Sequence, residues 1–360
     1  MTFSRIQILF VLLLFIGISN HVLIVPHLLG AAKRDAWLCV LISYGVLLLW
    51  IGVYSFIFSR NKQRQPLSTW IEFRAGKVVS KIIIFLFMAY IILIAFIAFF
   101  DFIVSVKIYF LPLTPTWVVV IPFLLLSIWA ASTSIKTIVY TSALLLPIVW
   151  ALGHFVAFST MDGKDYSYLF PILADDEASI SKGVVIILGG SVDLLLLFLL
   201  QQYFKKPVSY LYLFLLVTFL MGLVIGPTIG SITAFGPFVA ADLRFPAFEQ
   251  WRLVSIGEHI SHVDALAVFQ LISGAIIRVS LCFYLLPDVM KVQSIKVKRA
   301  IIILFATVLA VGMLIHISDI WIQTILINYF YPSVLLFGIC VTLLLVIISY
   351  LPVKKGTHSA

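Results

Sequence analysis

Residues 16–26 read Ile16-Gly-Ile-Ser-Asn-His-Val-Leu-Ile-Val-Pro26 and lie in the middle of the apolar segment 6–29. Gly17 weakens a helix at this point, and Pro26 removes one backbone donor. Ser19 and Asn20 can hydrogen-bond the backbone groups that a break would free. A broken first helix with small polar residues near the bilayer midplane is how many secondary transporters build a substrate site. The alternative is a glycine kink in a span whose Ser and Asn side chains face neighbouring helices.

The whole chain is far too apolar for a soluble domain. Of its 360 residues, 63% are hydrophobic and only 11% are charged, and its mean hydropathy is +1.18. Soluble domains carry roughly 25% charged residues. The three cysteines, Cys39, Cys282 and Cys340, lie in apolar runs, which indicates neither a disulfide framework nor a metal site. The composition therefore predicts an all-α integral membrane protein.

Ten apolar runs are long enough, or nearly so, to cross a bilayer, which takes about 20 residues. They are 6–29, 36–58, 82–106, 117–132, 137–158, 184–203, 208–235, 263–286, 300–316 and 327–351. Lys and Arg concentrate at both termini and in the loops of one side. Because cytoplasmic loops carry the excess of positive charge, we expect both termini in the cytoplasm. The net charge of +9 thus reflects topology in the lipid bilayer and does not indicate a nucleic-acid partner.

Ten spans divide into two halves of five, and the sixth span is interrupted as the first is. In Ile187-Leu-Gly-Gly-Ser-Val-Asp193, two glycines and a serine stand beside an ionisable residue. Matched breaks predict a 5+5 inverted-repeat transporter core in which unwound backbone of spans one and six faces each other. We expect one membrane domain, 1–360, made of a first repeat (6–158), an outer loop (159–183), a second repeat (184–351) and a cytoplasmic tail (352–360).

The two predicted breaks mark the candidate ligand-binding site. Half-helix ends offer free N–H groups to an anion such as an α-carboxylate, and free carbonyl groups meet an ammonium. A zwitterionic amino acid fits this arrangement, and an uncharged polar ligand is the alternative. Ile94 and Phe198 are expected to line the part of the pocket that holds the ligand side chain. The candidate ligand-binding residues are Gly17, Ile18, Ser19, Asn20, Ile94, Asp101, Gly189, Gly190, Ser191, Asp193 and Phe198.

Four acidic or basic residues within or near the spans each need a reason to be there. Asp264, which begins span eight, is expected to cap the N-terminus of that helix. Asp193 either serves the site or ion coupling, or it is a structural partner of backbone donors. Asp101 either presents a polar face to the bundle or, as we favour, pairs with Lys107 at the outer interface. Arg278 is expected to extend its side chain to the cytoplasmic headgroups.

Two stretches outside the spans stand out. Segment 60–81, with Trp70 and Phe73 among several basic residues, is either a short amphipathic element on the anionic inner leaflet or an ordinary basic loop. Segment 236–262 is too long for a tight turn and too aromatic for a linker, so we interpret it as a lid or a partner surface.

Nothing in the sequence indicates an enzyme. The seven histidines show no HExxH or other metal-binding spacing, and we find neither a Gly-x-Ser-x-Gly elbow nor a phosphate-binding loop. We therefore expect no catalytic residues, no cofactor and no metal.

Short motifs along most of the chain resemble one known family. Lys33-Arg34-Asp35-Ala36-Trp37 is similar to the loop between the first two spans of the B subunits of bacterial spore germinant receptors, the endospore germination permeases of the amino acid–polyamine–organocation superfamily. Three further stretches also resemble that family: Tyr168-Leu-Phe-Pro171, Phe235-Gly236 to Phe245-Pro246, and Ile256-Gly-Glu-His-Ile-Ser-His-Val-Asp264. Lys33 replaces the usual Gly, and His259, Ser261 and His262 replace an aromatic residue and a Glu-Arg pair. Any role of that lost Arg is therefore in doubt here.

The resemblance implies a ten-helix LeuT-like fold, with helices one and six broken, in the inner membrane of the dormant spore. It also implies a small nutrient germinant, commonly an amino acid, and a complex with a receptor A subunit and a lipoprotein C subunit. Ligand binding would trigger ion release and germination. Two alternatives share the same core: a proton- or ion-coupled amino-acid transporter, and a structural subunit with a vestigial pocket.

Overall fold

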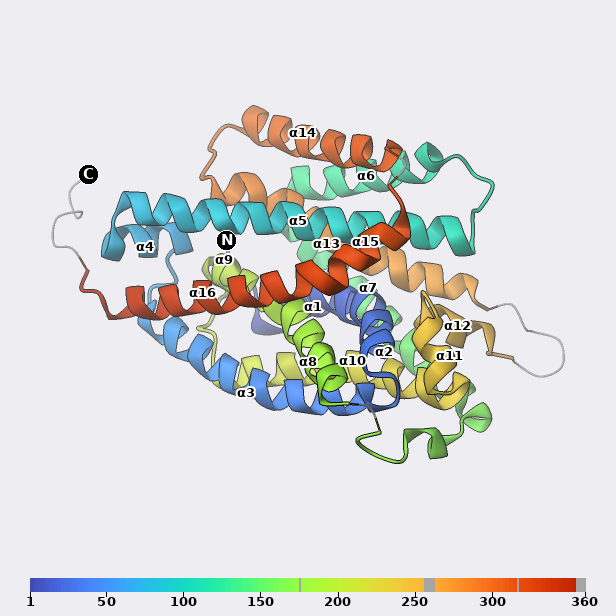
Figure 1. Cartoon of the computed structure of the whole chain (residues 1–360). Helices are drawn as coiled ribbons and strands as arrows, with labels where there is room; N and C mark the ends of the chain where they lie inside the picture. Colours follow the sequence, from blue (N-terminus) through green and yellow to red (C-terminus); the bar gives the residue numbers. More distant parts are fainter. Residues whose placement is uncertain (175, 256–262, 316, 354–360) are drawn as a thin grey trace.

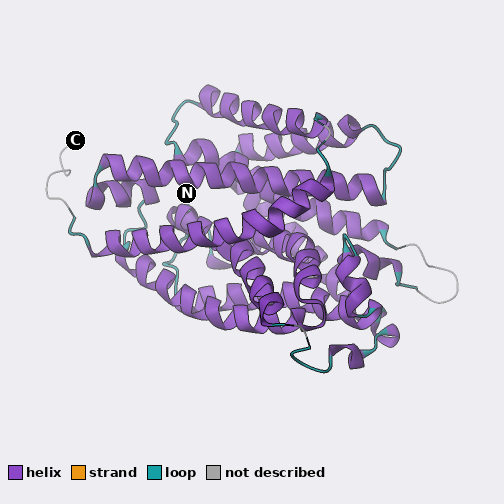
Figure 2. Ribbon diagram, viewed as in Figure 1, coloured by secondary structure: helices purple, strands orange, loops and turns teal. Residues whose placement is uncertain are grey.

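The computed structural model describes residues 1–174, 176–255, 263–315 and 317–353. Within these residues the regular structure is helical, apart from one isolated bridge between Phe3 and Phe204 (Figures 1 and 2). The α-helices are α1 Arg5–Ile18, α2 Val25–Ala32, α3 Ala36–Arg60, α4 Leu67–Ala75, α5 Lys77–Tyr109, α6 Thr116–Thr133, α7 Ile135–Ser159, α8 Glu177–Gly190, α9 Leu196–Leu200, α10 Tyr210–Phe235, α11 Pro237–Asp242, α12 Pro246–Arg252, α13 Ala265–Val289, α14 Ile295–Leu314, α15 Asp319–Ile325 and α16 Tyr331–Tyr350.

In the described part of the chain, nine helical segments are long and apolar enough to cross a membrane. The first of them, Arg5–Arg60, covers two of the ten predicted spans, which meet at the short 3₁₀ turn Lys33–Asp35. Lys33 has a positive φ of 39° there, so the α-helix is interrupted between α2 and α3. A multi-pass membrane protein is therefore confirmed, whereas ten spans and the 5+5 repeat stay predictions.

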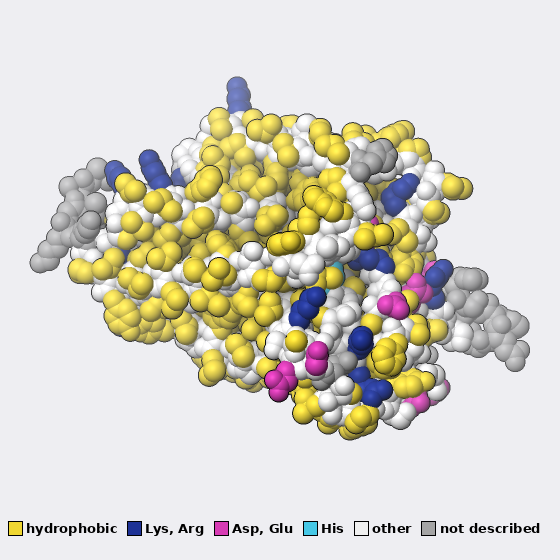
Figure 3. Space-filling view, in the orientation of Figure 1, with side chains coloured by type: hydrophobic (Ala, Val, Ile, Leu, Met, Phe, Trp, Pro, Cys, Tyr) yellow, Lys and Arg dark blue, Asp and Glu magenta, His cyan; other side chains and the backbone are white. Residues whose placement is uncertain are grey.

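The helices differ sharply in how much protein surrounds them. The most apolar window of Glu177–Tyr203 is 89% buried inside the protein, whereas that of α7 is only 11% buried. Segment 177–203 lies at the centre, where α8 packs against α2, α3 and α16. Hydrophobic side chains cover the middle of the face seen in Figure 3, and charged side chains gather near the end that carries α11 and α12. An apolar outer surface is what a lipid-facing bundle needs.

Both predicted interruptions are present, but neither is unwound. In span one a π-helix, Ser19–Ile24, joins α1 to α2. In span six a 3₁₀-helix, Ser191–Leu195, joins α8 to α9. A π-helical turn inside an α-helix is rare and often marks a functional site. The expectation of unwound backbone is thus corrected, because both segments remain helical, one as a π-helix and the other as a 3₁₀-helix.

Segment 60–81 contains a helix whose apolar residues face the protein. Leu67, Trp70 and Ile71 of α4 are buried, and α4 packs against α5 and α16. Arg74 donates a hydrogen bond of 2.6 Å to the carbonyl of Leu351 and lies over the ring of Trp70. Since α16 and α5 cover its apolar side, α4 is neither of the two alternatives we gave, an amphipathic element lying on the leaflet or an ordinary loop.

Two short helices, α11 and α12, form the described part of segment 236–262. Gly236 ends α10 with a φ of 79°, a value that favours glycine. Gln250 of α12 donates a 2.9 Å hydrogen bond to Ser231 of α10, and a Cβ at Gly230 would lie only 2.4 Å from the Gln250 Oε1. Segment 236–255 is therefore anchored tightly to α10. His259 and His262 lie outside the described residues.

Candidate functional site

A buried ion pair lies at the centre of the bundle. The Arg278 Nη1 of α13 lies 2.7 Å from the Asp193 Oδ2 of the 3₁₀-helix, and both side chains are at most 3% exposed. Tyr90 of α5 donates a 2.6 Å hydrogen bond to the Asp193 Oδ1. The same Nη1 donates to the carbonyl of Phe15 in α1 at 2.8 Å, and the guanidinium lies over the Phe15 ring. We call Tyr90, Asp193 and Arg278 the central cluster.

The central cluster corrects the prediction for Arg278. We expected this side chain to reach the headgroups, but it is 3% exposed and points into the bundle toward Asp193. The physical reason is that a carboxylate on a neighbouring helix stabilises the guanidinium where it stands. Asp193 and Arg278 are both isolated charges in apolar runs, and this shared feature could have indicated the pair from the sequence.

A cavity of about 10 Å³ adjoins the central cluster. Its lining residues are Leu23, Tyr90, Ile94, Ile97, Gly189, Gly190, Asp193, Arg278, Phe330 and Tyr331. Four predicted site residues therefore meet here: Ile94, Gly189, Gly190 and Asp193. A cavity this small is near the minimum that holds one water molecule. The cavity is thus too small to hold an amino acid in this conformation, and we call it closed in that sense.

Other predicted site residues lie elsewhere. Gly17 faces α10, where a Cβ would lie 2.9 Å from a methyl group of Leu223. Ser191 donates a hydrogen bond to the carbonyl of Ile187 in the last turn of α8. Phe198 does not line the cavity, because its ring packs between Tyr54 and Phe58, with centroids at 4.8 and 4.6 Å. The side chains of Ile18, Ser19 and Asn20 lie outside the description of the structure.

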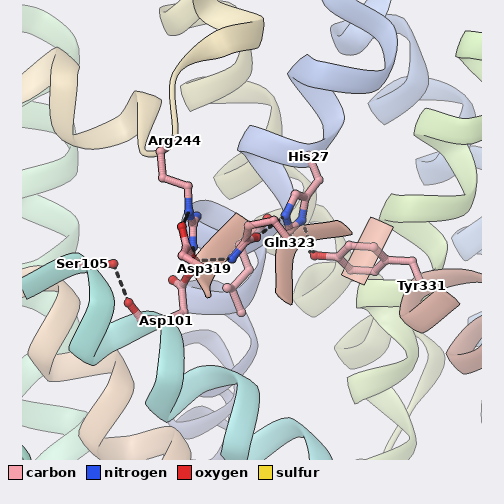
Figure 4. A network of polar contacts seen from close by, with 8 residues as sticks. His27, Asp101, Ser105, Arg244, Asp319, Gln323 and Tyr331 are labelled. Carbon is pink, nitrogen blue, oxygen red and sulfur yellow. Dashed lines mark hydrogen bonds and ion pairs between the residues drawn. The ribbon is translucent and has the colours of Figure 1, made fainter. Parts of the chain in front are cut away.

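A second charged cluster lies at the end that carries α11 and α12 (Figure 4). Arg244 lies in the turn between these helices. Its Nη2 lies 2.6 Å from the Oδ1 of Asp101 in α5, and its Nε lies 2.9 Å from the Oδ2 of Asp319 in α15. Burial by itself would lower the pKa of Arg244, but the neighbouring carboxylates raise it above its ordinary value, so the side chain stays charged. We call Arg244, Asp101 and Asp319 the end cluster.

The end cluster corrects the prediction for Asp101. We favoured Lys107 as its partner, but Lys107 donates hydrogen bonds to the carbonyls of Pro112 and Thr114 in the loop that follows α5. Arg244 was missed because it lies 143 residues from Asp101 along the chain, and no sequence spacing relates them. The alternative we gave, a polar face toward the bundle, describes Asp101 correctly.

Hydrogen bonds join the end cluster to the wall of the central cavity (Figure 4). Gln323 donates a 2.9 Å hydrogen bond to Asp319 and lies 2.6 Å from the His27 Nε2. The His27 Nδ1 lies 2.9 Å from the hydroxyl of Tyr331, which itself lines the cavity. Since His27 belongs to α2, Gln323 to α15 and Tyr331 to α16, this chain of contacts connects α2 with α15 and α16. His27, Gln323 and Tyr331 were not predicted from the sequence.

A larger cavity than the central one lies elsewhere in the described part of the structure. It measures about 390 Å³ and lies at the opposite end, near α4, where Ser68, Asp288, Lys291 and Lys298 are among its lining residues. None of the predicted site residues lines it. The smaller cavity is the better candidate site, because isolated buried charges inside a membrane protein mark function more specifically than an open surface hollow.

A metal site has no support in the described residues, where no three His, Cys, Asp or Glu side chains gather closely enough to hold an ion. What the central cavity offers instead is one cation and one anion side by side, two tyrosine rings and an aliphatic wall. Such a site can bind a small polar molecule by its charges and its apolar part together.

Comparison with known proteins agrees with this architecture. A family model described as "Spore germination protein" matches residues 2–320. The chain is 33% identical over 326 residues to spore germination protein XB of Bacillus anthracis, covering 91% of each chain. It is 23% identical over 293 residues to spore germination protein KB of Bacillus subtilis strain 168, covering 78% of this chain and 76% of that one. This multi-pass membrane protein therefore belongs to the spore germination protein family.

Proposed function

We propose that this protein is the nutrient-sensing membrane subunit of a spore germinant receptor. It binds a small germinant, an amino acid, in the cavity beside Asp193 and Arg278, and binding triggers germination. The observation that carries the proposal is the closed cavity at the two helix interruptions, lined by a buried pair of opposite charges. Family membership and the printed names of the relatives support the germination role.

The predicted surroundings follow from this role. The protein lies in the inner membrane of the spore with both termini in the cytoplasm, so the end with α11 and α12 faces outward. The germinant reaches the cavity from that end, past the end cluster. A receptor A subunit and a lipoprotein C subunit are the expected partners, and the ten-span inverted repeat is the expected topology.

Spores that carry a single substitution at Gly190 test the location of the site. A Cβ at Gly190 would lie 2.2 Å from the Ile24 Cδ1, so Gly190→Leu displaces the cavity wall that Gly190 forms and should abolish the response to the germinant. Gly222→Leu in α10 is the matched control, because nothing lies within 4 Å of a Cβ there. Both variants must be present in spore membranes at the level of the unsubstituted protein. A normal response by Gly190→Leu would refute this site.

Purified protein in proteoliposomes distinguishes the receptor from a transporter. The receptor proposal expects a labelled amino acid to bind without accumulating inside the vesicles. Accumulation against a proton or ion gradient would instead favour the coupled transporter.

A further inference from the structure

The central cluster has bonding capacity that its protein partners do not use. A guanidinium carries five N–H donors. The Arg278 Nη1 donates to Asp193 and Phe15, whereas the Arg278 Nε is buried without a hydrogen-bond partner among the described residues. A buried polar group without a partner is unfavourable, and more so when it is charged. Arg278 lines the cavity, so a ligand there can supply the missing acceptor.

We propose that the Asp193–Arg278 pair is the charge-recognition element of the site and selects a zwitterion. In the closed cavity the two side chains neutralise each other. When the ligand enters, its carboxylate binds Arg278, including Nε, and its ammonium binds Asp193. This inference rests on the proposed germinant site and goes further, because it names the two groups that read the ligand's charges and rejects ligands that lack either charge.

Electrostatics inside the bundle select for both charges at once. Breaking a buried pair by removing one partner is strongly unfavourable, because the other charge is left uncompensated. A zwitterion that separates Asp193 from Arg278 gives each residue a new partner and leaves the net charge unchanged. A monocarboxylate would leave Asp193 unpaired, and a simple amine would leave Arg278 unpaired. A sugar or nucleoside has no charge with which to replace the internal contact.

The cavity walls limit the rest of the ligand. A Cβ at Gly189 would meet the carbonyl oxygen of Tyr331 at 2.5 Å. The wall at Gly189 therefore packs directly against the backbone of α16 and leaves no room for a side chain. The other walls are apolar, including Ile94 and Ile97 of α5 and Phe330. With about 10 Å³ available, binding requires side chains such as Leu23 and Tyr331 to move outward. The apolar walls therefore favour an amino acid with an apolar side chain.

A binding series on the full-length protein tests the charge requirement directly. Thermal stability is measured with glycine, L-alanine, L-valine, L-alaninamide, propionate, ethylamine, glucose and inosine, because a ligand of the folded state raises the melting temperature. At least one of the three amino acids should stabilise the protein. The amide, the acid and the amine should bind at least about tenfold more weakly than that amino acid. Equal affinity for L-alanine and L-alaninamide would overturn the proposal.

A charge-removing variant tests which side chain reads which charge. In Asp193→Asn the guanidinium of Arg278 loses its internal anion, so the preference should shift from L-alanine toward propionate. Tyr203→Phe is the control, because Tyr203 bonds Asp288 at the α4 end and does not line the site. An unchanged preference in folded Asp193→Asn would overturn the assignment. If that variant does not fold, the binding series on the unsubstituted protein tests whether both ligand charges are required.

The outcomes separate this inference from the proposed function. Stabilisation by glucose or inosine alone would refute charge recognition while leaving a germinant-binding protein. No stabilisation by a compound that triggers germination of spores through this protein would count against the proposed function and against the charge assignment with it.

Discussion

The central cluster and the end cluster are both built from one arginine and carboxylates, yet their surroundings differ. In the central cluster the side chains of Arg278 and Asp193 are 3% and 2% exposed, and both belong to helices inside the bundle. In the end cluster Arg244 is 21% exposed and lies in the turn between α11 and α12, outside the candidate spans. The first cluster can be broken only from inside the bundle, whereas the second can open when one short segment moves.

This difference assigns two tasks to similar chemistry. A charge pair shielded from bulk water is suited to recognition, because water competes little for it. A pair of which one member is carried by a non-spanning segment is suited to controlling access. Tyr331 connects the two, since it lines the cavity and its hydroxyl lies 2.9 Å from His27. Opening of the end cluster should therefore loosen the cavity wall.

Loss of Arg278 should have the largest effect on stability. Arg278→Met leaves Asp193 buried and uncompensated, so we expect the free energy of unfolding to fall by about 3–5 kcal/mol. Reversible unfolding of the purified protein in mixed micelles measures this loss. The double variant Asp193→Leu/Arg278→Met removes both charges and should recover most of the stability. A double variant no more stable than Arg278→Met would show that packing, and not the unpaired charge, causes the loss.

Much of this architecture was predictable, and the reasons for the exceptions are physical. Apolar runs predicted a bundle of membrane-crossing helices, and the steps Gly17-Ile-Ser19 and Gly189-Gly190-Ser191 predicted the two interruptions, because these are local properties of the chain. The partners of Asp101 and Arg278 were wrong because each lies on an element distant in the sequence, and only packing brings them together. Phe198 was misplaced because a 3₁₀ segment precedes α9 and changes the rotation per residue from that of an α-helix.

Loss of Arg244 should have a smaller effect on stability and a larger one on access. Arg244→Met leaves Asp101 and Asp319 without their cation. Because the cluster is partly exposed, we expect the free energy of unfolding to fall by only about 1–3 kcal/mol. Association of a germinant should become faster, as measured by stopped-flow binding, because the turn between α11 and α12 loses its contacts with α5 and α15. Arg252→Met on the same segment is the control, since Arg252 is exposed and forms its ion pair with Glu249, three residues away on the same helix. Equal association rates in the two variants would contradict an access role.

Removal of one hydroxyl should test the connection between the clusters. Tyr331→Phe keeps the ring that lines the cavity and deletes the group beside the His27 Nδ1. A single neutral hydrogen bond contributes about 1 kcal/mol to stability. If the connection matters, Tyr331→Phe should also reduce the effect of Arg244→Met on the association rate, which a double-mutant cycle measures. Strict additivity of the two substitutions would separate the clusters functionally.

The smallest effect is expected at a third ion pair, which lacks the burial that both clusters share. The Lys291 Nζ lies 3.8 Å from the Glu72 Oε2 at the α4 end, and the two side chains are 46% and 31% exposed. Exposed pairs contribute about 0–1 kcal/mol because water and salt screen them. Glu72→Gln should therefore change the free energy of unfolding by less than about 0.5 kcal/mol and leave ligand binding unaltered. A loss as large as that of Arg244→Met would mean that fractional exposure does not rank the charge pairs of this protein, and the contrast between the central and end clusters would lose its basis.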